Sequence, residues 1–147
     1  INRRLGYLVG RMHNAGFFHG DLFMRNILVG INGAEPSFHF IDCHQGRWTR
    51  LPGRAFAYDL GCYEKWAATL FDEKTRGHFF SGYLEARPGE NLDKILRRTN
   101  RARQRIVLRR LKRKRESHKK RQHLEPTLNT EPLDPALILQ LLNSQGT

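Results

Sequence analysis

The first apolar residues of the chain recur at the spacing of one helical face. They stand at i, i+3, i+4 and i+7, namely Leu5, Leu8, Val9 and Met12. This spacing predicts an amphipathic helix over residues 2–15. Gly16 follows and suits the left-handed position that commonly ends a helix. The predicted helix therefore leads, through two phenylalanines, directly into a polar segment that begins at His19.

Two short apolar runs come next and predict a β-hairpin. Residues 27–29 and 38–41 are rich in strand-forming side chains, and Asn32-Gly33 between them is a turn signal. Such a hairpin places Asn26 at the start of its first strand and Asp42 just past the end of its second. We therefore expect both side chains at the same edge of one small sheet.

Helical patterns account for most of the remaining chain. We expect helices at residues 57–71 and 75–85, and a long helix from residue 91 that fades near residue 122. Residues 43–54 have the composition of a loop. Asp59 falls in the first turn of the predicted 57–71 helix, where the helix dipole favours an acidic side chain.

Together these patterns predict an α+β fold, mainly helical with one short hairpin. We expect a first domain over residues 1–122 that ends in a basic helix. Residues 123–147 contain a proline-rich linker, which leads into a short helix that begins at Pro135. The apolar face of that helix is formed by Leu137, Ile138, Leu141 and Leu142.

Composition excludes two classes of protein. Cys43 and Cys62 are the two cysteines, without metal-ligand spacing, which points to a reduced, cytosolic protein and against a disulfide scaffold. No stretch approaches the roughly 20 apolar residues of a membrane-spanning helix. The 147 residues suffice for one domain with a moderate core.

The net charge of +12 is concentrated in one segment. Residues 97–121 hold fourteen Lys and Arg and one acidic residue, Glu116, whereas the rest of the chain holds twelve basic and thirteen acidic residues. We therefore expect this segment, Arg97–Arg121, to be the surface that meets an anionic partner.

The polar segment after the first helix carries the chemistry. It reads His19-Gly20-Asp21, followed by Asn26, and Asp42 comes after the second predicted strand. This is the H-x-D-x-x-x-x-N pattern of kinase-like phosphotransferases. In that reaction one carboxylate accepts the proton of the attacking hydroxyl, while an amide and a second carboxylate hold Mg²⁺ on the phosphates of ATP.

The stretch from His13 to Arg47 resembles the lipopolysaccharide kinase family, which phosphorylates Kdo or heptose in the inner core. The resemblance rests on His-Gly-Asp-Leu, on Arg-Asn-Ile-Leu and on Phe-Ile-Asp-Cys-His-Gln-Gly-Arg, which follows with almost no activation segment. A helix that starts near Asp59-Leu60 and the arginine-rich C-terminal part extend it.

The resemblance implies a protein-kinase-like C-terminal lobe that uses ATP and Mg²⁺ to phosphorylate a sugar hydroxyl. Asp21 would be the catalytic base, and Asn26 and Asp42 would bind Mg²⁺ and through it the nucleotide. His19 would be a structural member of the loop. Asp59 would be a buried carboxylate that anchors the loop backbone, which is an alternative to the helix-dipole explanation.

The sequence departs from the kinase pattern at several positions. Phe23 stands where many kinase-like loops carry Lys, His or Asn, so Arg25 is the candidate for a positive charge near the transferred phosphate. His44 replaces the glycine of the usual Asp-Phe-Gly. No glycine-rich phosphate loop or strand lysine precedes His19. We therefore expect the N-terminal ATP-binding lobe to be absent, the sequence to be a fragment, and this fragment by itself to be inactive.

The resemblance also implies partners and a location. We expect a lipid-linked sugar substrate and a cytoplasmic protein peripheral to the inner membrane, with Arg97–Arg121 on the anionic membrane surface. Two alternatives remain open. An aminoglycoside- or RIO-type phosphotransferase would share the loop motif. A non-catalytic nucleic-acid-binding module would use the basic segment for phosphate contacts, although that segment contains no aromatic residue on which bases stack.

Overall fold

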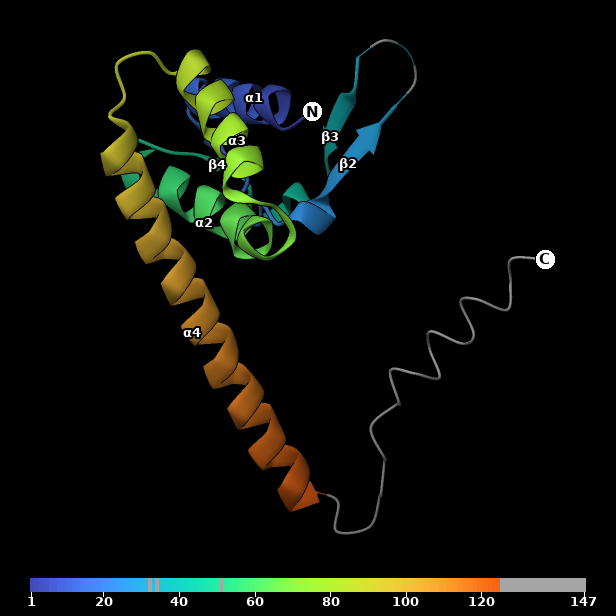
Figure 1. Cartoon of the computed structure of the whole chain (residues 1–147). Helices are drawn as coiled ribbons and strands as arrows, with labels where there is room; N and C mark the ends of the chain where they lie inside the picture. Colours follow the sequence, from blue (N-terminus) through green and yellow to red (C-terminus); the bar gives the residue numbers. More distant parts are fainter. Residues whose placement is uncertain (32, 34, 51, 125–147) are drawn as a thin grey trace, which may run out of the picture. The chain divides into compact units, whose positions relative to one another are not determined.

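The computed structural model describes residues 1–31, 33, 35–50 and 52–124. It combines helices with short antiparallel strands and is mostly helical (Figure 1). In chain order the elements are α1 (Asn2–Asn14), β1 (Phe17–Phe18), the 3₁₀ turn η1 (Met24–Asn26), β2 (Ile27–Gly30), β3 (Ser37–Phe40), the 3₁₀ turn η2 (Cys43–Gln45), β4 (Arg47–Trp48), α2 (Pro52–Leu70), α3 (Glu73–Ala86) and α4 (Leu92–Leu124).

The chain divides into two compact units, residues 1–112 and 113–147. The predicted linker and short helix after residue 124 lie outside the described residues, so the expected boundary at residue 122 stays a prediction. Within the described part of the chain, no helix is both long enough and apolar enough to cross a membrane.

The strands form two separate antiparallel pairs. The predicted hairpin is confirmed as β2 and β3, with Ile27 opposite Phe40 and Gly30 opposite Ser37. It stands beside the N-terminal end of α1 (Figure 1), where Arg4 and Glu35 form an ion pair. The second pair was not predicted: β1 and β4 are each two residues long, too short for any alternation of side chains to appear in the sequence.

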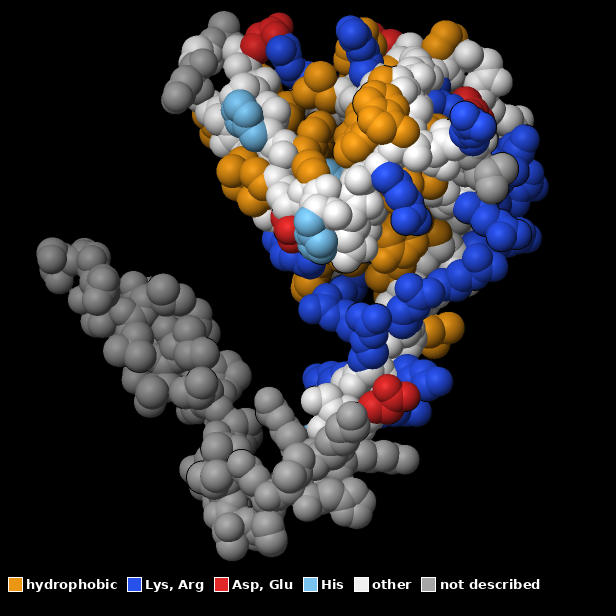
Figure 2. Space-filling view, turned by 180° about the vertical axis from the view of Figure 1, so that it is seen from behind, with side chains coloured by type: hydrophobic (Ala, Val, Ile, Leu, Met, Phe, Trp, Pro, Cys, Tyr) orange, Lys and Arg blue, Asp and Glu red, His pale blue; other side chains and the backbone are white. Residues whose placement is uncertain are grey.

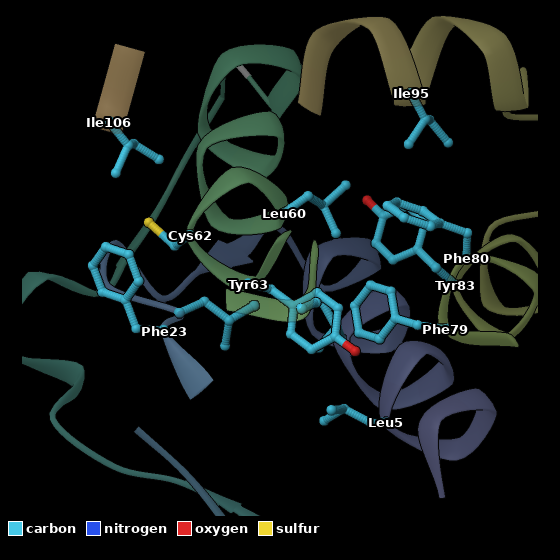
Figure 3. Packing of buried hydrophobic residues seen from close by; sticks show 13 residues of the cluster. Leu5, Phe23, Leu60, Cys62, Tyr63, Phe79, Phe80, Tyr83, Ile95 and Ile106 are labelled. Carbon is cyan, nitrogen blue, oxygen red and sulfur yellow. The ribbon is translucent and has the colours of Figure 1, made fainter. Parts of the chain in front are cut away.

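Helix α2 is the centre of the core. Its buried residues fall on all sides of the helix, as expected for a helix surrounded by other elements. The Tyr63 ring stacks on the Phe79 ring of α3 with centroids 3.9 Å apart. Figure 3 shows apolar side chains of α1, α2 and α3 pointing toward one another, with Ile95 and Ile106 of α4 closing the cluster.

The structure starts α2 at Pro52, five residues before the predicted position. Proline is favoured in the first turn of a helix because its missing N–H has no helical partner there. The prediction that this Pro-Gly pair belongs to a loop is therefore wrong. Asp59 consequently lies about two turns inside α2, away from the helix end to which the dipole explanation applies.

Glycines allow α1 and α3 to pack with their backbones in contact. A Cβ atom on Gly82 of α3 would overlap the carbonyl of Arg3 in α1, and a Cβ on Gly6 of α1 would overlap the carbonyl of Phe79. On the same interface, a Cβ on Gly10 would lie 2.7 Å from the Cβ of Ala86. Since these neighbours are mostly backbone atoms, they cannot move aside like a flexible side chain.

We predict that Gly82→Ala destabilises the protein by about 1–3 kcal/mol, because the added methyl forces the two helices apart. Gly77→Ala is the matched control in the same helix. Gly77 is exposed and a Cβ there meets nothing within 4 Å, so its change should stabilise by up to about 1 kcal/mol through helix propensity. Urea unfolding measures both. Equal stability of the two variants would contradict the close contact.

Candidate active site

Asp21 lies on the loop between β1 and η1, held by two neighbours on the same loop. Its side chain is 15% exposed. The Asn26 Nδ2 group donates to the Asp21 carbonyl oxygen at 2.8 Å and to Asp21 Oδ2 at 2.9 Å. Arg25 Nη2 donates to the same Oδ2 at 2.8 Å. The five-residue spacing from Asp21 to Asn26 therefore lets the amide brace the carboxylate directly.

Asn26 and Asp42 come to the same edge of the hairpin, as the sequence predicted. The Ile41 N–H donates to the Asn26 carbonyl oxygen at 3.0 Å, and Asp42 is the next residue. Asn26 is buried, whereas the Asp42 side chain is half exposed. Asp42 has left-handed backbone angles, φ 60° and ψ 43°, which few residues other than glycine adopt. This turn directs the chain from β3 into η2.

His19 ties the loop to the strand that precedes Asp42. It is fully buried, and its Nε2 lies 2.9 Å from the Ile41 carbonyl oxygen. A carbonyl only accepts, so Nε2 carries the proton and donates. Nδ1 then accepts from the Asp21 N–H at 3.3 Å. His19 is thus neutral and bridges the two segments that carry Asp21 and Asp42.

The Asp59 carboxylate holds the backbone of the loop from below. Its Oδ2 accepts from the His19 N–H at 2.7 Å, and its Oδ1 accepts from the Gly20 N–H at 2.9 Å. Asp59 is completely buried. A buried carboxylate is tolerated only when such donors satisfy it. The contacts are those expected of a loop anchor.

His13 of α1 completes this support and was missed by the sequence interpretation. Its Nε2 lies 3.3 Å from Asp59 Oδ2, its Nδ1 lies 2.9 Å from the Tyr83 hydroxyl, and its ring stacks on Phe56 at 4.1 Å. Burial lowers the pKa of His13, so the ring is neutral and donates from Nε2 to Asp59. One sequence signal for a buried His13 was available: it lies four residues after Val9, on the apolar face of the predicted helix.

Gly20 allows the turn η2 to pack against the loop. It has a positive φ of 78°, and a Cβ at this position would lie 2.7 Å from the Gln45 carbonyl oxygen. In the same turn, His44 Nδ1 lies 2.7 Å from Asp42 Oδ1. His44, which stands where kinases usually have glycine, therefore fixes the rotamer of Asp42.

The loop edge offers oxygen atoms of the type that Mg²⁺ prefers. The Asn26 amide nitrogen is used by Asp21, and the Asn26 Oδ1 accepts no hydrogen bond from the described residues. Asp42 Oδ1 accepts a hydrogen bond from His44, so Asp42 Oδ2 is the oxygen that remains available to a metal ion. Within the described part of the chain, no three His, Cys, Asp or Glu side chains gather as a metal site. One carboxylate and one amide fit Mg²⁺, because this ion usually takes its other ligands from water and substrate phosphates.

Basic side chains from other elements lie near the loop. Burial lowers the pKa of Lys65 in α2, and the charges of Arg110 and Arg25 lower it further. Lys65 Nζ is also 5.2 Å from the centre of the Phe23 ring. Burial and the neighbouring Cys62 raise the pKa of Tyr58, and the charge of Arg109 in α4 opposes this rise. The charges of the basic helix α4 therefore influence Tyr58 and Lys65 of α2, which the sequence did not indicate.

The model of the lipopolysaccharide kinase (Kdo/WaaP) family matches residues 1–83, more than half of the chain. The chain belongs to this family. The resemblance inferred from the sequence is thereby confirmed. The family is one of kinases, which supports a phosphotransferase in general. A comparison with curated protein sequences finds no match.

The family match covers every residue that the sequence singled out for the site, from His19 to Asp59. It ends within α3, so α4 and its basic segment lie outside it. The individual roles of Asp21, Arg25, Asn26, Asp42, His19 and Asp59 stay predictions, which the geometry above makes specific.

We predict that Asp59→Asn lowers the free energy of unfolding by about 1–3 kcal/mol. The asparagine side chain has one oxygen and one NH₂ group, so either the His19 or the Gly20 N–H would face a donor. Asp72→Asn is the matched control, because Asp72 is an exposed N-cap that accepts from the Thr75 N–H and asparagine caps equally well. Chemical unfolding compares them. If both variants change stability by less than about 0.5 kcal/mol, Asp59 does not anchor the loop.

Proposed function

We propose that this chain is the kinase-like C-terminal lobe of a lipopolysaccharide kinase. It would transfer the γ-phosphate of ATP to a sugar hydroxyl of the inner core, on Kdo or heptose. The observation that carries the proposal is the position of the Asp21 carboxylate. It is partly exposed, braced by Asn26 and mounted on a loop that Asp59 holds by its backbone.

Asp21 acts as the general base in this proposal. Its carboxylate accepts the proton of the sugar hydroxyl as that oxygen attacks the phosphate. The hydrogen bond from Asn26 to Oδ2 orients the carboxylate, and Oδ1 is left to face the substrate. Because phosphoryl transfer depends mainly on positioning, a rigid loop is more important here than a strongly shifted pKa.

Asn26 and Asp42 would hold Mg²⁺ through Asn26 Oδ1 and Asp42 Oδ2. Magnesium–ATP, when bound, supplies the phosphoryl group and neutralises its charge. His44 positions Asp42 by its hydrogen bond to Oδ1, and His19 keeps the two carboxylate-bearing segments at a constant distance.

Arg25 provides the positive charge that a lysine provides in many kinase-like loops. Its guanidinium bonds Asp21 and lies 4.6 Å from the centre of the Phe23 ring, and its side chain is 55% exposed. An exposed arginine reorients at little cost, so it can move from the carboxylate to the transferred phosphate.

We predict that Asp21→Asn lowers the rate constant for phosphate transfer in the complete enzyme by about 10²–10⁴-fold, because an amide does not accept the proton. Asn26→Ala and Asp42→Ala should instead weaken Mg²⁺-dependent binding of the nucleotide. Asp93→Asn, an exposed change in the first turn of α4, is the control and should leave the rate unchanged. Transfer of labelled phosphate to a Kdo–lipid A precursor measures the rate. A folded Asp21→Asn enzyme with near-native activity would exclude Asp21 as the base.

We also propose that α4 docks the enzyme on the anionic cytoplasmic face of the inner membrane, where a lipid-linked sugar is available. Lys and Arg side chains cover much of the surface along α4 (Figure 2). Among them, Leu108 and Leu111 are 65% and 52% exposed. Basic residues around exposed leucines are typical of helices that lie in the membrane interface.

The same features disfavour the nucleic-acid alternative. Leucine side chains add nothing to phosphate-backbone contacts, and no aromatic residue in Arg97–Arg121 offers a platform for bases. The positive charges of Arg109 and Lys65 would also attract an anionic substrate that reaches Asp21 from the side of α4.

We predict that the protein co-sediments with vesicles in proportion to their anionic lipid content and dissociates as salt rises. Leu108→Ser with Leu111→Ser should weaken binding by about tenfold or more, because two apolar side chains no longer enter the interface. Leu70→Ser, at an exposed leucine of α2, is the control. Binding that is indifferent to lipid charge, or that is abolished equally by soluble RNA at low concentration, would remove the membrane proposal.

A further inference from the structure

A small cavity lies at the N-terminal end of α2, away from the catalytic loop. It has a volume of about 180 Å³ and is lined by residues of the first three turns of α2, the C-terminal end of α3, the segment after α3 and the first two turns of α4. Pro52 and Gly53 of α2 are at its wall. Nothing in the mechanism proposed above uses it.

The first turn of α2 makes the cavity electropositive. Pro52 has no N–H, but the N–H groups of the next residues have no acceptor within the helix, and the macrodipole places partial positive charge there. Helix α2 has 19 residues, so its dipole is fully developed. Such an end attracts anions when other groups converge on it.

Thr99 of α4 supplies an independent sign of a missing ligand. Thr99 is 1% exposed and lines the cavity. Its hydroxyl is buried and has no hydrogen-bond partner among the described residues. Since a buried hydroxyl without a partner is costly, the structure favours an occupant that bonds to it.

Three cations surround the same space. Arg87, Lys94 and Arg98 line it, against one carboxylate, Glu90. The Arg87 side chain is 12% exposed and bonds Asn14 through Nη1 at 2.9 Å and Glu90 through Nη2 at 2.7 Å. Its buried Nε–H, by contrast, finds no acceptor in the described part of the chain.

These donors converge from three elements with an excess of two positive charges. A water molecule would satisfy single donors but would leave that excess charge in place. A carboxylate has one charge and two oxygens in a plane, whereas a phosphate monoester carries up to two charges and three oxygens. The volume of about 180 Å³ accommodates a phosphate group with little more than its first ester atoms.

We propose that this cavity is a binding site for a phosphate group, either inorganic phosphate or the phosphate monoester end of a larger molecule. Thr99, Lys94 and Arg98 bind the oxygens together with Arg87 Nε and the first turn of α2. Four of these five groups come from residues beyond position 83, outside the part of the chain that the family model matches. The site is therefore a feature of this chain in addition to its kinase loop.

The occupied site would adjoin the support of the catalytic loop. The Arg87 guanidinium lies over the rings of Phe56 and Tyr83, at 5.1 and 5.8 Å. Those two residues in turn contact His13, which bonds Asp59. A bound phosphate would consequently restrain Arg87 and, through it, the packing around His13.

The test is a calorimetric titration of the 147-residue chain with inorganic phosphate at constant ionic strength. Lys94→Gln with Arg98→Gln should weaken binding by about tenfold or more, because two charge-assisted contacts are lost. Thr99→Val, which keeps the shape of the side chain, should weaken it by about threefold to tenfold. Arg11→Gln with Lys74→Gln removes the same charge at exposed positions away from the cavity and should change the affinity by less than about twofold.

A second arm identifies the source of the phosphate. Vesicles that contain phosphatidic acid are compared with vesicles that contain the same fraction of phosphatidylglycerol, which has no phosphate monoester. A preference for phosphatidic acid that Lys94→Gln with Arg98→Gln abolishes assigns the site to a lipid headgroup, whereas saturable binding of inorganic phosphate alone assigns it to a small phosphate. Equal losses in the cavity and control variants, or no saturable binding in either arm, would overturn the site. Neither readout depends on phosphate transfer, so the proposed kinase function is judged separately.

Discussion

The structure of the site depends on one buried carboxylate. Asp59 has no access to water, so its charge is tolerable only if protein donors satisfy it. Those donors are the backbone N–H groups of His19 and Gly20 and the ring of His13. Because the loop donates through its backbone, its position is determined before any substrate arrives. The requirements of a buried charge and of a rigid loop at the proposed active site are therefore met by the same hydrogen bonds.

The rest of the core serves to keep Asp59 in place. It sits in the middle of α2, the helix that the other elements surround, and His13 of α1 bonds its Oδ2. Helix α1 is fixed in turn by its backbone contact with α3 at Gly6 and Gly82. The site itself lies at the margin of this core, where β2 and β3 bring Asn26 and Asp42 together. Rigid packing behind a partly open edge suits a reaction that depends on positioning.

Electrostatics distinguish α4 from the rest of the molecule. The chain outside Arg97–Arg121 is nearly neutral, so the field of the protein originates mainly in this helix. Near its middle, the charge of Arg109 lowers the pKa of Tyr58 and the charge of Arg110 lowers the pKa of Lys65, both in α2. At its beginning, Lys94 and Arg98 help to line a cavity with unsatisfied buried donors. A substrate class rich in phosphate and carboxylate groups would meet favourable potential at each of these places.

Much of this arrangement is determined by the sequence, because its signals are local. The helices and the hairpin follow from apolar spacing and turn residues, and the spacing from Asp21 to Asn26 and Asp42 predicts the loop and the hairpin edge.

Three features were decided only by the tertiary structure. They are the pairing of β1 with β4, the contact of Gly20 with Gln45, and the hydrogen bond between His13 and Asp59. Each joins residues more than twenty positions apart in the sequence. The predicted start of α2 is five residues too late, and it places Asp59 at a helix end, where the dipole would act on it. Periodicity predicts which face of an element is apolar. The partner of a buried polar side chain depends instead on which elements pack together, and that packing is determined by the core as a whole.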